Sequence, residues 1–168
     1  KDKDCTIFAT VGNEHKRSYL LSTFKMLTPE HIFDSRGPST NFMLNLTRQR
    51  GGIGVDVIVN SLASEKLKQS LNLLANGGRF MEVWKYDLLN NTTVGLRPLF
   101  EDKQFHVIAL DQLLYQAQSD PHSQRMCTSL STMIQHGIEM EFVQPLPIFE
   151  FEFSSAGMKS ATAFSSKG

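Results

Sequence analysis

The sequence has little cysteine, no excess of either charge and no long apolar run. Its 168 residues include only Cys5 and Cys127, which match no metal-ligand spacing and are too few for a disulfide framework. We interpret both as reduced thiols of a cytoplasmic protein, with Cys5 in a buried strand. Lys and Arg number 17 and Asp and Glu 17, so we expect no binding to nucleic acid or to an anionic membrane. The longest apolar stretches have the length of a strand, so none is expected to span a membrane.

What the sequence does contain is an alternation of strand and helix patterns. Short apolar runs predict strands at residues 5–11, 31–35, 55–60, 79–84 and 105–110. Asn13 is expected to cap a helix through about Lys25, and Leu67, Leu71 and Leu74 mark the buried face of a later helix. Such alternation implies right-handed crossovers. We therefore predict an α/β fold class, with a Rossmann-like parallel sheet and helices on both faces.

The C-terminal part is expected to begin with a long helix. Asp120-Pro121 is typical of a helix start, because aspartate caps the helix and proline suits its first position. Two prolines interrupt residues 142–153, which predicts an edge strand or an irregular segment. Ser154 or Ser155 is then expected to cap a last helix.

Polar residues stand where two of the predicted strands end. Asn60 and Ser61 close one strand, and Lys85 follows the next strand along the chain. In an open α/β sheet, ligands bind at the carboxyl ends of the strands. The sequence therefore predicts a ligand site that includes these three residues.

One glycine-rich segment resembles a dinucleotide-binding loop but occurs in the wrong order. Such a loop follows a strand and opens a helix, whose N-terminus holds the pyrophosphate. The segment Gly51-Gly52-Ile53-Gly54 instead follows a predicted helix and precedes a strand. We interpret it as a helix stop and a tight turn.

The end of the first predicted strand allows two interpretations. Gly12 and Asn13 are followed by Lys16 and Arg17, which on spacing alone form an ordinary capped helix with a solvated pair of cations. In a Rossmann-type domain, however, an acidic residue at the end of the second strand selects NAD, and cations there favour the 2′-phosphate of NADP.

Several segments together resemble the enoyl reductase domains of animal fatty acid synthases and related reducing polyketide synthases. The likeness spans nearly the whole chain, and its segments are Thr10–Leu20, Phe33–Arg36, Gly51–Leu62, Gly78–Glu82, Lys85–Asn91 and Phe105–Asp111. The resemblance implies a reductase of the medium-chain dehydrogenase/reductase type that needs no zinc. NADPH would supply a hydride to the β-carbon of an enoyl thioester carried on an acyl carrier protein. The partners would be the other domains of a synthase that is a homodimer.

The resemblance also assigns site residues. It implies Lys85 and Asp111 as the candidate acids that protonate the enolate. The residues that it implies for cofactor binding are Gly12, Asn13, Lys16, Arg17, Ser35, Arg36, Asn60, Ser61, Leu62 and Lys85. A lysine ammonium is charged at neutral pH, so it can both stabilise an enolate and donate a proton. Asp111 would have to be protonated to act as an acid, and otherwise it orients Lys85 or a water.

Simpler interpretations of these residues remain. Lys85 is then a solvated loop lysine, and Asp111 caps a helix over residues 112–118. The five histidines form no metal-ligand pattern, so no metal site is predicted.

The sequence departs from the family in three ways, and the first two suggest a fragment. The substrate-binding, catalytic subdomain is absent, as are the central first strand and its glycine-rich turn, and Trp84 replaces a glycine just before the lysine. In the strand order 3-2-1-4-5-6 the missing strand is central, so its neighbours should be separated. We predict that residues 1–168 form a single partial nucleotide-binding subdomain of a larger chain, inactive in isolation. The alternatives are a non-catalytic fragment or scaffold module and a zinc-independent quinone oxidoreductase-like domain.

Overall fold

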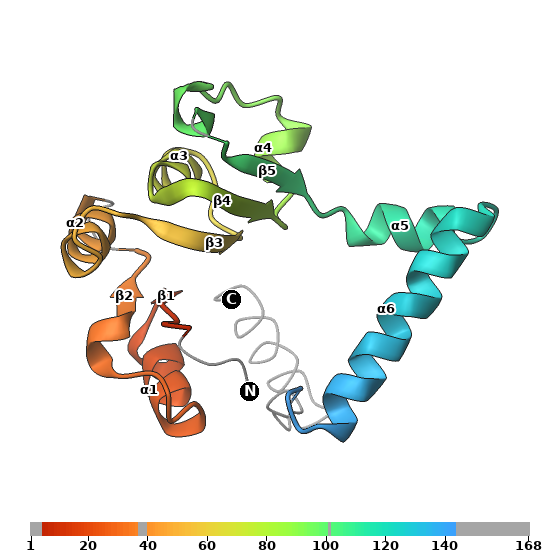
Figure 1. Ribbon diagram of the computed structural model, residues 1–168, viewed down its shortest axis with the longest axis horizontal. Helices are drawn as coiled ribbons and strands as arrows, with labels where there is room; N and C mark the ends of the chain where they lie inside the picture. The colour runs from red at the N-terminus through yellow and green to blue at the C-terminus, as the bar shows by residue number, and fades with distance from the viewer. Residues whose placement is uncertain (1–4, 37–39, 101, 144–168) are drawn as a thin grey trace, which may run out of the picture. The chain divides into compact units, whose positions relative to one another are not determined.

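The computed structural model describes residues 5–36, 40–100 and 102–143. These fall into two compact units, Lys1–Leu110 and Asp111–Gly168, each of which is described by itself. The first unit contains every strand of the described residues (Figure 1). The predicted strand or irregular segment after residue 143 and the helix capped by Ser154 or Ser155 lie outside the described residues.

The strands of the first unit form two separate parallel sheets. β1 (Ala9–Val11) pairs with β2 (Ile32–Asp34). A second sheet has the order β3-β4-β5, with bounds Val55–Asn60, Leu74–Glu82 and Gln104–Val107. All pairings are parallel, which confirms the predicted α/β class.

Helices connect the strands in the predicted alternation. The first unit contains α1 (Glu14–Thr23), α2 (Thr40–Gln49), α3 (Glu65–Asn72) and α4 (Tyr86–Leu89), with short 3₁₀ helices at Pro29–His31 and Arg97–Leu99. They are followed by α5 (Leu110–Gln116) and α6 (Pro121–Glu139). Two predicted caps are confirmed: the Asn13 side chain accepts from Lys16 N, and that of Asp120 accepts from Ser123 N.

Helices cover both faces of the first sheet. Ile32 and Phe33 are adjacent in β2, so their side chains point to opposite faces. Ile32 packs with Leu27 and the apolar residues of α1, whereas Phe33 packs with Phe42 and Leu46 of α2. On the second sheet, α3 buries Leu67 and Leu71 against Phe80. Leu74 joins the same cluster, but from β4, because α3 ends before it.

β1 is shorter than the predicted strand over residues 5–11, and Cys5 is exposed rather than buried. β2 has only three residues, so it offers no partner for residues 5–8. On its other side β1 has no paired strand either. Without backbone partners on either side, this segment cannot form a ladder.

β1 and β3 do not pair with each other, as expected if a strand is missing between them. A cleft of about 430 Å³ is lined by residues 5–10 on one side and by β3 on the other. Val57 and Val59 line it and are 47% and 72% exposed. The first unit therefore presents an open apolar edge on β3.

The glycine-rich segment ends α2 as predicted. Gly51, Gly52 and Gly54 all have positive φ, at 61°, 84° and 87°. A Cβ on Gly54 would lie 2.6 Å from the carbonyl oxygen of Leu73. This segment is therefore a turn into β3 rather than a phosphate-binding loop.

Candidate functional site

The carboxyl ends of β3 and β4 meet at a buried pair, Asn60 and Glu82. The two residues are direct cross-strand partners and are 3% and 2% exposed. Asn60 Nδ2 donates to Glu82 Oε2 at 2.6 Å and to the carbonyl oxygen of Leu62 at 2.7 Å. Glu82 Oε1 accepts from the backbone N–H of Trp84 at 2.7 Å. One carboxylate therefore holds the turns that follow two neighbouring strands.

The burial of Glu82 changes its acidity. Desolvation raises the pKa of this carboxyl above its ordinary value, and the negative charge of Asp87 acts in the same direction. The hydrogen bonds from Asn60 and Trp84 oppose this rise of the pKa because they favour the ionised form.

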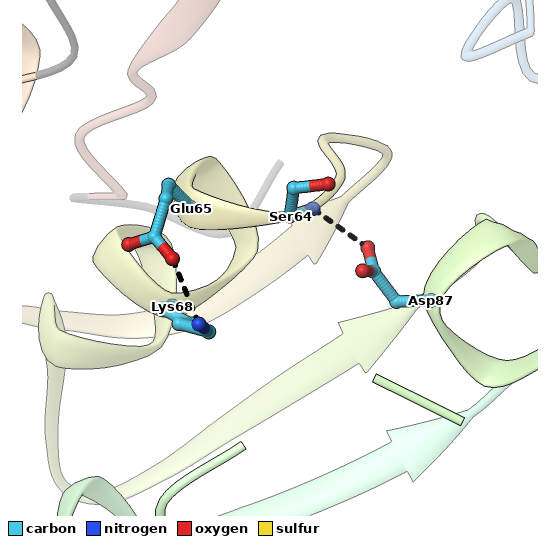
Figure 2. A network of polar contacts seen from close by, with 4 residues as sticks. All are labelled: Ser64, Glu65, Lys68 and Asp87. Carbon is cyan, nitrogen blue, oxygen red and sulfur yellow. Dashed lines mark hydrogen bonds and ion pairs between the residues drawn. The ribbon is translucent and has the colours of Figure 1, made fainter. Parts of the chain in front are cut away.

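A second buried carboxylate ties the N-terminus of α3 to the start of α4. Asp87 is 6% exposed, and its Oδ2 accepts from the backbone N–H of Ser64 at 2.8 Å (Figure 2). Ser64 is the N-cap residue, but its own side chain makes no capping bond. Asp87 therefore satisfies the backbone N–H of the N-cap residue, as the acidic residue of a capping box does, and its charge suits the positive end of the helix.

In the sequence, Lys85 lies between Glu82 and Asp87. It is half-buried, at the N-cap position of α4, and follows the turn that Glu82 holds. Ser61 and Leu62 line the cleft with Asn60, so three predicted cofactor residues share one edge. Trp84 is 54% exposed.

The second group of predicted residues lies at the ends of β1 and β2. Ser35 N donates to the carbonyl oxygen of Val11, which joins the two strand ends. A Cβ on Gly12 would lie 2.7 Å from Arg36 Nε, so only glycine lets the guanidinium lie against the backbone here. Lys16 is exposed in the first turn of α1.

Arg17 is held by backbone carbonyls. Its guanidinium donates to Ile32 O at 2.7 Å and to Pro29 O at 2.6 Å. These bonds fix the segment before β2 onto α1. They give Arg17 a structural task, and its cofactor role stays a prediction.

Asp111 belongs to the second unit. It lies in the first turn of α5, which begins at Leu110, so the alternative of a cap before residue 112 is wrong. Its partnership with Lys85 stays a prediction.

Three side chains at these strand ends were not among the predicted site residues. They are Glu82, Asp87 and Lys66, whose Nζ donates to the carbonyl oxygen of Ser35. The signal for Glu82 was available, because it shares a strand face with the buried Phe80, where an acid is unusual. The other two depend on contacts between distant segments.

The described ranges 5–36, 40–100 and 102–143 contain neither a candidate metal site nor a candidate membrane span. Within them no group of three or more His, Cys, Asp or Glu residues could hold a metal ion. No helix of this part of the chain combines the length and apolarity needed to cross a bilayer.

Comparisons with known proteins identify relatives of this chain. No family model matches the chain. The highly reducing polyketide synthase easB of Emericella nidulans is 32% identical over 149 residues, which are 88% of this chain and 6% of that protein. The chain spans only about 4 to 6% of the length of such curated relatives.

Solved structures point to one part of those proteins. The nucleotide-binding subdomain of the enoylreductase domain of PpsC from Mycobacterium tuberculosis is 29% identical, with a TM-score of 0.63. The match covers 79% of this chain and 69% of that subdomain. The CurK enoyl reductase is 25% identical with a TM-score of 0.69, over 96% of this chain and 44% of that protein.

Proposed function

We propose that this chain, which is homologous to part of the reducing polyketide synthases and has the fold of their enoyl reductase nucleotide-binding subdomain, is the NADPH-binding half of an enoyl reductase. The homology and the fold support a nicotinamide-binding role. The choice of NADPH is inferred from the cations at the ends of β1 and β2, whereas the substrate and the partners are inferred from the resemblance to the enoyl reductases.

The residues present fit a phosphorylated dinucleotide. Gly12 leaves the space that the Arg36 guanidinium takes up, and Lys16 is exposed one turn away. Two cations beside a strand end suit a 2′-phosphate. Asn60, Ser61 and Leu62 would hold the other half of the cofactor at the end of β3. When bound, NADPH supplies a hydride to the substrate.

Lys85 is the candidate residue for stabilising the negative charge that develops on the substrate. Reduction at the β-carbon of an enoyl thioester leaves an enolate, which must be stabilised and protonated at the α-carbon. A half-buried ammonium can do both, by electrostatic attraction and by donating its proton. Asp111 would orient Lys85 or a water.

The open edge of β3 supports the proposal that this chain is part of a larger protein. We infer that a strand from the preceding polypeptide completes the sheet in the cleft between β1 and β3. Adjacent strands lie about 4.8 Å apart, and an inserted strand would bond to both edges. The parent would be a cytoplasmic, homodimeric synthase that presents an enoyl thioester on its acyl carrier protein.

The proposed function is tested in the enoyl reductase that includes the preceding polypeptide. NADPH oxidation with a crotonyl thioester is expected, and Lys85→Ala should lower kcat by about 100-fold. Lys103→Ala, on the loop before β5, is the matched lysine control and should leave kcat unchanged. Equal rates for wild type and Lys85→Ala would remove Lys85 from the mechanism. An absence of turnover in the wild type would contradict the proposed function itself.

A further inference from the structure

Glu82 bonds, through its side chain and its backbone, to residues at the ends of all three strands of the second sheet. Its side chain bonds to Asn60 at the end of β3 and to the backbone one residue before Lys85. Its own carbonyl oxygen accepts from Ile108 N, just after β5, at 2.8 Å. Glu82 was not among the predicted site residues, yet it contacts the turns that carry Asn60 and Lys85.

The chemistry of these contacts requires an acceptor at both oxygens. Asn60 Nδ2 and Trp84 N are both donors, and an ionised carboxylate is the side chain that only accepts. A glutamine here would turn its NH₂ group toward one of the two donors. Because the pair is nearly inaccessible to water, the lost bond could not be replaced by solvent.

The same bond fixes the conformation of the turn after β3. The two hydrogens of Asn60 Nδ2 are directed to Glu82 Oε2 and to the carbonyl oxygen of Leu62. Asn60 and Leu62 line the cleft, which places this turn at the proposed cofactor site.

We propose that Glu82 is a positioning residue, whose ionised carboxylate joins the turn at Asn60 to the turn at Trp84 and thereby fixes Lys85 relative to the cofactor. This inference rests on the proposed function. Glu82 acts through other residues and touches no reacting atom.

Titration of Glu82 gives this role a signature. Burial raises the pKa of its carboxyl above the ordinary value of 4.5, and Asp87 on α4 adds to the rise. Its cross-strand neighbours, Asn60 on β3 and Val107 on β5, are uncharged. Below the raised pKa one oxygen carries a proton and faces an N–H donor, so kcat should fall as the pH falls.

The free energy of unfolding should change with pH in the direction opposite to kcat. The folded chain binds the Glu82 proton more tightly than the unfolded chain, so unfolding releases it between pH 4.5 and the raised value. The free energy of unfolding therefore decreases as the pH rises through that window. A low pH thus stabilises this part of the fold while it lowers kcat, which a purely structural role would not produce.

The test uses the enoyl reductase that includes the preceding polypeptide, with NADPH and a crotonyl thioester. Glu82→Gln should lower kcat about tenfold, leave the KM for NADPH within about twofold, and abolish the acid limb of the pH profile. Glu139→Gln is the matched control, because that exposed carboxylate bonds only with Gln135 among the described hydrogen bonds. It should change neither kcat nor the profile.

A second variant covers the case in which Glu82→Gln does not fold. Asn60→Ala removes a hydrogen bond that lowers the pKa of Glu82, so the acid limb should move to higher pH. An unmoved limb would overturn the proposal, as would an unchanged kcat in Glu82→Gln. A wild type without turnover would instead refute the proposed function, and both inferences would fall together.

Discussion

Removal of the Asp87 carboxylate should destabilise the chain by about 1.5 kcal/mol. Loss of a helix-capping side chain costs about 0.5–2 kcal/mol, and hydrogen bonds to charged groups contribute about 1.5–3 kcal/mol. Asp87 Oδ2 bonds to Ser64 N, but Oδ1 is buried with no hydrogen-bond partner among the described residues. Deleting that oxygen relieves a desolvation cost, so we expect about 1.5 kcal/mol, the lower end of the range for hydrogen bonds to charged groups.

Urea unfolding of the chain measures this effect. With a slope of about 2 kcal/mol per molar, Asp87→Ala should lower the unfolding midpoint by about 0.7 M. Asp87→Asn keeps an acceptor for Ser64 N, so its midpoint should lie between those of Asp87→Ala and the wild type. The matched control is Glu65→Ala on the same helix, because Glu65 and Lys68 form an exposed ion pair (Figure 2).

The two contacts in Figure 2 differ chiefly in exposure. The side chains of Glu65 and Lys68 are 72% and 39% exposed, so their pair should be worth at most about 0.5 kcal/mol. Equal midpoint shifts in Asp87→Ala and Glu65→Ala would refute the argument that Asp87 caps α3. So would an unchanged midpoint in Asp87→Ala.

Three glycines and Arg36 provide further tests. Gly54→Ala should destabilise the chain by more than about 2 kcal/mol in urea unfolding, because its Cβ would lie 2.6 Å from Leu73 O. Gly52→Ala has a similar φ but open space around it, so about 1 kcal/mol is expected; equal costs would contradict the steric argument. In the parent reductase, Gly12→Ala should displace Arg36 and lower the preference for NADPH over NADH, measured as a ratio of kcat/KM. Arg36→Gln should lower that ratio about tenfold, and an unchanged ratio in both variants would place the 2′-phosphate elsewhere.

The elements that local chemistry determines were predicted well. Asn13 and Asp120 cap their helices through bonds to residues three positions away, which depend on no distant contact. β3 occupies Val55–Asn60, the predicted range, because a short segment rich in valine and isoleucine between two turns favours a strand. Gly51–Gly54 forms the predicted turn, since its positive φ values need glycine.

The errors have tertiary causes. Residues 5–8 are apolar enough for a strand, but a strand also needs a neighbour, and β2 ends too soon to supply one. The β4 ladder starts at Leu74 rather than at Arg79, because Leu74 pairs with Val55 before a register shift. Glu82 and Asp87 acquire their roles from bonds to residues about twenty positions earlier, which no local pattern reveals.

Deuterium transfer from the cofactor to the substrate is the decisive test of the proposed enoyl reductase activity. The enoyl reductase that contains this chain would be supplied with a crotonyl thioester and NADPH deuterated at the transferred position of the nicotinamide. We expect a saturated thioester with deuterium at the β-carbon and a solvent proton at the α-carbon, seen by mass spectrometry and NMR. An unreduced thioester, or deuterium at any carbon other than the β-carbon, would contradict it.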